Sequence, residues 1–103
     1  MKSEQYSVLA VFKARPGKEE ELKRALQEMV EPTLAEEGCI NYDLHQSVDN
    51  KAQFMFYENW SNQAAHSQHN VAAHIEAWRK KKDQLLEENC VVTAWKMINI
   101  NDK

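Results

Sequence analysis

The stretch that decides the fold is INYDLHQS-VDNK-AQFMFYENW, residues 40–60. Its two halves, residues 40–47 and 52–60, are rich in aromatic, aliphatic and β-branched side chains, and this composition predicts two strands. The short polar connection at residues 48–51 indicates a hairpin. We therefore expect two neighbouring antiparallel strands in the middle of the chain.

Helical patterns flank this hairpin on both sides. From residue 18 to residue 37, apolar side chains recur at helical spacing, three glutamates crowd the first turn, and Gly38 suits a C-terminal cap. Pro32 should kink this helix or end its regular part. After the hairpin, a second helical segment should begin with Ser61 as N-cap, break near Asn70 and continue to about residue 88.

The two ends of the chain complete the pattern. Residues 5–14 predict a strand that Arg15-Pro16-Gly17 ends, and residues 90–100 predict a final strand. With right-handed crossovers, the order strand, helix, strand, strand, helix, strand leaves the ferredoxin-like βαββαβ sandwich, an α+β fold. We expect residues 1–103 to form a single domain with its core at about residues 6–97.

Both faces of the predicted sheet should be apolar. In the first strand Val8 and Phe12 alternate with Leu9 and Val11, so neither face is clearly polar. An antiparallel sheet with one solvated face normally alternates apolar and polar residues. We therefore expect the face away from the helices to pack against a second copy of the chain in a homodimer.

Composition excludes several classes of function. Sixteen acidic residues against 13 basic ones give a net charge of −3, which argues against a nucleic-acid partner. No stretch approaches the roughly 20 apolar residues of a membrane span, and no apolar run of signal-peptide type precedes the first strand, so we expect a cytoplasmic protein with no membrane partner.

Cys39 and Cys90 should begin strands at opposite edges of the sheet, too far apart for a disulfide.

Most of the side chains that could carry chemistry lie close together in the sequence: Tyr57, Glu58, Trp60, His66, His69, His74 and Trp78. Glu58 and Trp60 are two apart on a strand and point to one side of the sheet. A carboxylate among aromatic rings would have a raised pKa and could move protons. A glutamate that only accepts structural hydrogen bonds is an equal alternative.

The histidines allow several interpretations. His66 and His69 are neighbours on a helix, whereas His74 reaches the same region only if the helix breaks near Asn70. Three histidines and a glutamate could ligate zinc or iron, but no metal-binding motif supports this, so we expect no metal. For His69 and His74, contact with a ligand and a structural role remain open, and His66 is expected at the surface. The three tryptophans are core residues by default, yet they permit a pocket for a flat ligand.

These residues give the chain a resemblance to the antibiotic biosynthesis monooxygenase family. The matching features are Arg15-Pro16-Gly17 before an acidic helix start, Glu36-Glu37-Gly38-Cys39 followed by Tyr42, Tyr57-Glu58-Asn59-Trp60, His69, and His74-Ile75-Glu76-Ala77-Trp78. The resemblance implies a dimeric α/β-barrel with a pocket between sheet and helices in each subunit. It also implies a monooxygenase that oxidises a small aromatic or quinol-type substrate with molecular oxygen and needs no cofactor.

The same resemblance implies roles for individual residues. It assigns catalysis to His69, His74 and Glu58, and substrate binding to Trp60, Tyr42, Tyr57 and Trp78. Ala10 occupies the first-strand position at which haem-degrading relatives carry an asparagine, so haem degradation is disfavoured. The residues before His74 depart from the threonine-proline-histidine turn that is frequent in the family. The alternative function is a dimeric small-molecule-binding or stress-response protein, or an isomerase, of the same fold without redox activity.

Overall fold

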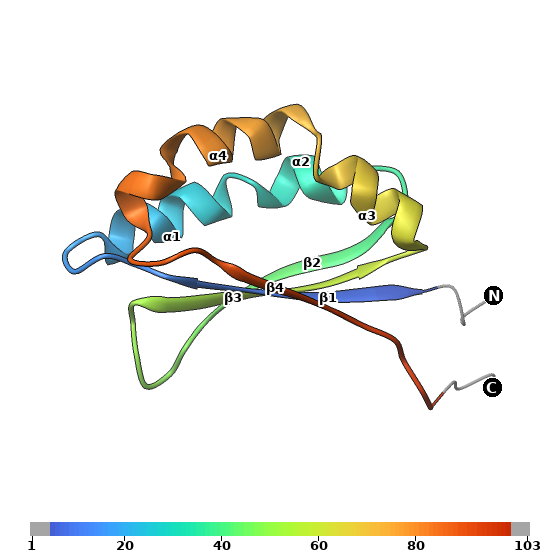
Figure 1. Ribbon diagram of the computed structural model, residues 1–103, viewed down its shortest axis with the longest axis horizontal. Helices are drawn as coiled ribbons and strands as arrows, with labels where there is room; N and C mark the ends of the chain where they lie inside the picture. Colours follow the sequence, from blue (N-terminus) through green and yellow to red (C-terminus); the bar gives the residue numbers. More distant parts are fainter. Residues whose placement is uncertain (1–4, 100–103) are drawn as a thin grey trace.

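The computed structural model describes residues 5–99, which form a sheet covered by helices on one face (Figure 1). The elements are β1 (Tyr6–Lys13), α1 (Glu19–Gln27), α2 (Val30–Leu34), β2 (Cys39–Gln46), β3 (Gln53–Trp60), α3 (Gln63–His69), α4 (Ala73–Leu85) and β4 (Val91–Trp95). The predicted α+β, ferredoxin-like order is confirmed, with each helical segment divided into two helices.

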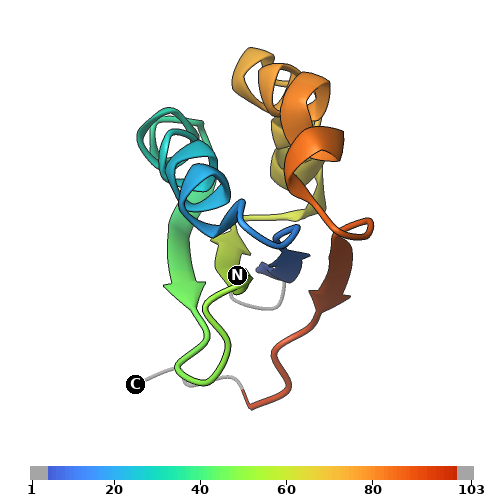
Figure 2. The same ribbon diagram turned by 90° about the vertical axis from the view of Figure 1, so that its left-hand side faces the viewer.

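The sheet has the order β2-β3-β1-β4, and every pair of neighbours is antiparallel. Figure 2 shows α1 and α2 above the β2 side of the sheet and α3 and α4 above the β4 side. The register places Glu58 opposite Val8 on one side and opposite Tyr42 on the other, so all three face the helices. The strand pairs expected from the hairpin and from the right-handed crossovers are therefore adjacent in the sheet.

The core lies between the sheet and the helices. Alternate residues of β3 point into it, and Phe54, Phe56 and Trp60 are at most 1% exposed. From α1, Leu22 and Leu26 complete this layer, because residues four apart lie on one face of a helix. The packing fixes β3 and thereby places Glu58, which lies between two of its core aromatics.

The helices break where the chain cannot continue a regular hydrogen-bond ladder. Pro32 has no N–H to bond to the carbonyl of Glu28, so α1 ends at Gln27 and Pro32 falls in the first turn of α2, where the missing donor is tolerated. The second segment breaks near Asn70 as predicted. Its N-cap is Asn62 rather than Ser61, because the Asn62 side chain accepts a hydrogen bond of 2.9 Å from the Ala65 N–H.

Two predicted boundaries were too long. Helix α4 ends at Leu85 instead of continuing to residue 88, because Leu86 takes an extended backbone and forms a bridge with Ala14. Strand β4 has five residues, and the predicted end of this strand, Ile100, lies outside the described residues. Cys39 begins β2 and Cys90 precedes β4, at opposite edges of the sheet as predicted, and both are free thiols.

The face of the sheet away from the helices is only partly apolar. Among residues 5–99, its exposed large apolar side chains include Tyr57, Val91, Trp95 and Met97. A polar row crosses the same face, in which the Asn59 amide accepts from Ser7 and donates to Asn41 at 2.9 Å. The expectation of an apolar second face therefore holds along part of β1, β3 and β4 but not along this row. Within residues 5–99, no helix has the length and apolar character needed to cross a membrane.

Candidate functional site

A cavity of about 140 Å³ lies between the sheet and the helices. All four strands, α3 and α4 contribute side chains to its wall. Its polar and aromatic lining includes Tyr42, Glu58, His66, His69, Trp78 and Arg79. The cavity lies where the family resemblance implies a pocket, between the sheet and the helices.

Glu58 places a buried carboxyl group at this cavity. The residue is 3% exposed, and its Oε1 accepts a hydrogen bond of 2.9 Å from the indole N–H of Trp60. The pKa of Glu58 is raised to about 7: burial is the main cause, the indole hydrogen bond opposes it, and the nearby charge of Glu36 adds to it. A group that titrates near neutral pH can both take up and release a proton.

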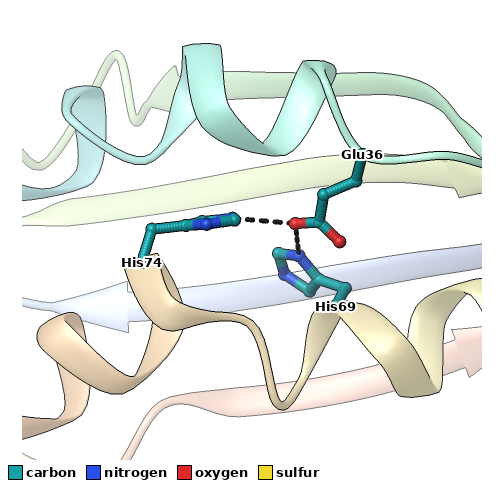
Figure 3. A group of neighbouring side chains, drawn as sticks. All are labelled: Glu36, His69 and His74. Carbon is teal, nitrogen blue, oxygen red and sulfur yellow. Dashed lines mark hydrogen bonds and ion pairs between the residues drawn. The ribbon is translucent and has the colours of Figure 1, made fainter.

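A second cluster joins Glu36 to two histidines (Figure 3). Glu36 lies in the bend after α2, and its Oε2 is 2.7 Å from Nδ1 of His69 and 2.7 Å from Nε2 of His74. A carboxylate can only accept, so both nitrogens carry protons, and a neutral His69 keeps Nε2 as an acceptor. Burial lowers the pKa of His69, which favours this neutral form.

The cluster of Glu36, His69 and His74 is also the group of potential metal ligands that the described residues contain, with ligand atoms within 4.8 Å of one another. In a tetrahedral zinc site, neighbouring ligand atoms lie roughly 3.4 Å apart, because each is about 2.1 Å from the metal. The two nitrogen–oxygen distances of 2.7 Å are shorter and match hydrogen bonds. In this structure the three side chains form a hydrogen-bonded cluster, and its carboxylate is that of Glu36.

Tyr42 and Trp78 line the cavity, and each is nearly buried. Trp60, which the resemblance assigns to substrate binding, is fully buried and does not line the cavity, but it donates a hydrogen bond to Glu58. Tyr57 lies on the opposite face of the sheet with 39% exposure, because its neighbours Phe56 and Glu58 face the helices. Its predicted place in the pocket is therefore wrong for this cavity, and Tyr42 is the tyrosine that lines it.

The structure places the histidines differently from the prediction. His66 was expected at the surface, but its side chain is 12% exposed, lines the cavity and approaches Glu58 to 4.0 Å. The reason is that its ring packs between Tyr6 and Trp60. His69 lines the cavity as well, whereas His74 reaches it only through Glu36.

The sequence interpretation missed two groups at the site. Glu36 belongs to the motif that carries the family resemblance, but its partners lie more than 30 residues away and no spacing indicates them. Arg79 and Lys82 also line the cavity. They continue the helical spacing of Ile75 and Trp78, so a closer reading of that face of α4 could have found them.

Comparison with known proteins gives consistent matches. Residues 5–81 match the family model described as antibiotic biosynthesis monooxygenase. "Putative monooxygenase YcnE" of Bacillus subtilis is 36% identical over 77 residues, which cover 75% of this chain and 81% of that protein. "Putative monooxygenase Rv0793" of Mycobacterium tuberculosis is 32% identical over 85% of this chain and 86% of its own length. The crystal structure of PA3566 from Pseudomonas aeruginosa has a TM-score of 0.90 at 30% identity, covering 96% of this chain and 99% of that one.

Proposed function

Because this chain belongs to the antibiotic biosynthesis monooxygenase family, we propose that it oxidises a small aromatic or quinol-type substrate with molecular oxygen and without a bound cofactor. The observation that carries the proposal is the carboxyl group of Glu58, which is buried at the cavity and has a pKa raised to about 7. Such a group can deprotonate a phenolic hydroxyl at neutral pH, and deprotonation is what makes a quinol reactive toward oxygen.

The chemistry needs little from the protein. A quinol anion transfers electrons to oxygen, one oxygen atom replaces a ring hydrogen, and the other leaves as water. Ring hydroxylation and oxidation of the quinol to the quinone each supply two of the four electrons. The pocket has to orient the ring, stabilise the anion and exclude water.

Tyr42, His69 and Glu58 share these tasks in the proposed mechanism. Burial raises the pKa of Tyr42, so its hydroxyl stays protonated and can donate to a substrate oxygen. The neutral ring of His69 can accept a proton, and Glu36 holds that ring in place together with His74. Trp60 orients the carboxyl group of Glu58, and Trp78 forms a wall for the substrate ring.

The proposed enzyme is a homodimer in which the faces away from the helices pack against each other. Trp95 is 57% exposed on this face, next to the exposed Tyr57 and Met97, and such a patch is typical of an interface. Sedimentation velocity should show a dimer at micromolar concentration, and Trp95→Glu should shift it to the monomer. A monomeric wild type would refute the dimer.

Oxygen uptake with a panel of hydroquinones tests the activity. Tyr42→Phe removes the hydroxyl at the cavity and should lower kcat/KM by about tenfold, since one hydrogen bond to a developing charge is lost. Tyr57→Phe removes the matching hydroxyl on the other face of the sheet and should leave the rate unchanged. His69→Ala combined with His74→Ala should abolish most of the turnover. Binding of a quinol without any oxygen uptake would instead indicate the alternative, a small-molecule-binding protein or an isomerase.

A further inference from the structure

The exposure of its wall residues shows where the cavity opens. Glu58, Tyr42 and Trp78 are at most 6% exposed, whereas the side chain of Arg79 is 42% exposed, that of Lys82 is 30% exposed, and Val92 is 54% exposed. The cavity therefore has a buried inner end with a carboxyl group and a mouth between α4 and the β4 edge of the sheet.

Two cations border this mouth. One nitrogen of Arg79, Nη1, donates hydrogen bonds of 2.7 Å to the Asn70 carbonyl and 3.0 Å to Glu76, which hold the guanidinium in place. Its other N–H groups make no hydrogen bond within residues 5–99 and can serve a ligand.

The carboxylates that pair with these cations point into solvent. The side chains of Glu76 and Asp83 are 56% and 87% exposed, so water screens both pairs. Cys90 lines the cavity, and the positive charges of Lys82 and Arg79 lower the pKa of its thiol, although burial raises that pKa by more. Both charges therefore act on groups at the mouth. The mouth therefore favours an anionic group on a ligand.

The volume limits the size of the ligand. A cavity of about 140 Å³ is close to the roughly 150 Å³ that accommodates one benzene molecule and below the roughly 300 Å³ of an ordinary ligand pocket. The cavity therefore has room for one aromatic ring beside Phe12 and Trp78, and a fused second ring would have to extend out of the mouth.

We propose that the pocket binds a single-ring aromatic acid, with a ring hydroxyl directed to Glu58 at the inner end and a carboxylate held by Arg79 and Lys82 at the mouth. The role of the hydroxyl as the group that is oxidised rests on the proposed monooxygenase function. The binding preference does not, because it can be measured in the absence of turnover.

Isothermal titration under anaerobic conditions tests the preference with three probes: hydroquinone, dihydroxybenzoate and dihydroxynaphthoate. Dihydroxybenzoate should bind about tenfold more tightly than hydroquinone, since it adds charge-assisted hydrogen bonds at a partly exposed site. The advantage should shrink at high salt. Dihydroxynaphthoate should bind more weakly than dihydroxybenzoate. Equal affinity for hydroquinone and dihydroxybenzoate, or tighter binding of the two-ring acid, would overturn the proposal.

Arg79→Gln combined with Lys82→Gln should bring the affinity for dihydroxybenzoate down to that for hydroquinone and leave the affinity for hydroquinone unchanged. The control combines Lys80→Gln on α4 with Arg24→Gln on α1, because both residues are exposed and neither lines the cavity. A preference that survives the Arg79 and Lys82 changes would refute these residues as the anion site. If the preference is present but no probe supports oxygen uptake in air, the monooxygenase function fails and the binding assignment stands.

Discussion

Replacing Glu58 with glutamine should make the stability of the protein less dependent on pH. The carboxyl group has an ordinary pKa of 4.5, and burial raises it to about 7 in the folded chain. Between these values the folded state holds the proton more tightly than the unfolded state, so the free energy of unfolding falls as pH rises. A shift of about 2.5 pKa units corresponds to about 3 kcal/mol, lost between about pH 4.5 and pH 8.

Glutamine has a similar shape, keeps an acceptor for the Trp60 indole and carries no charge at either pH. The stability of Glu58→Gln relative to the wild type should therefore increase by about 3 kcal/mol from about pH 4.5 to about pH 8. Urea unfolding at both pH values and at one fixed protein concentration measures this change. The lowered pKa of His69 gives an opposite slope, but it is common to both proteins and cancels.

The control is Glu37→Gln, an exposed carboxylate close to the same end of the sheet. A relative stability of Glu58→Gln that stays constant between the two pH values would refute the reasoning, because the buried carboxyl would then not titrate as the structure implies. It would also remove the observation on which the proposed proton transfer depends.

Three further outcomes follow from the packing. Gly38→Ala should destabilise the fold by about 2–4 kcal/mol, because Gly38 has φ +88° and a Cβ there would lie 2.6 Å from the Cβ of Ala65. Gly17→Ala has a similar φ but open space around it, so chemical unfolding should show a loss of only about 1 kcal/mol, and equal losses would contradict this account. Phe56→Ala should lower the unfolding free energy by about 3–5 kcal/mol, since the ring is fully buried, and a smaller loss would indicate a looser core. At about pH 8, iodoacetamide should alkylate Cys39 roughly a hundredfold more slowly than an unhindered thiol, because burial raises its pKa to about 11, and rapid labelling would contradict that burial.

The sequence predicted the fold well because its local signals agree with one another. The hairpin at residues 40–60 and the helical patterns on both sides leave one topology, and the strands pair as expected. The differences are local. Asn62 replaces Ser61 as N-cap, since either side chain could cap the helix and only the backbone geometry decides between them. The sequence predicted that Pro32 interrupts the helix, but the residue at which the helix ends depends on tertiary packing.

The candidate site was less predictable, because it depends on contacts between distant segments. Strand alternation indicated Glu58 and Trp60 and should have excluded Tyr57, which is one residue out of phase. His69 and His74 come together only because Glu36, more than 30 residues earlier in the chain, accepts a hydrogen bond from each. No pattern within a window of the sequence carries that information. His66 is largely covered for the same reason, since Tyr6 of β1 packs against its ring.

Strand β4 has consequences beyond the pairing of the sheet. Val92 faces the cavity mouth, and Val91 and Trp95 face the other way, toward the bare face of the sheet. A ligand at the mouth and a second subunit on the bare face would thus contact opposite sides of the same five-residue segment. If ligand binding and self-association each make the backbone of this edge strand more rigid, occupancy of the pocket and self-association are thermodynamically linked. The linkage is reciprocal, so dilution would weaken ligand affinity by the same factor by which ligand tightens the assembly.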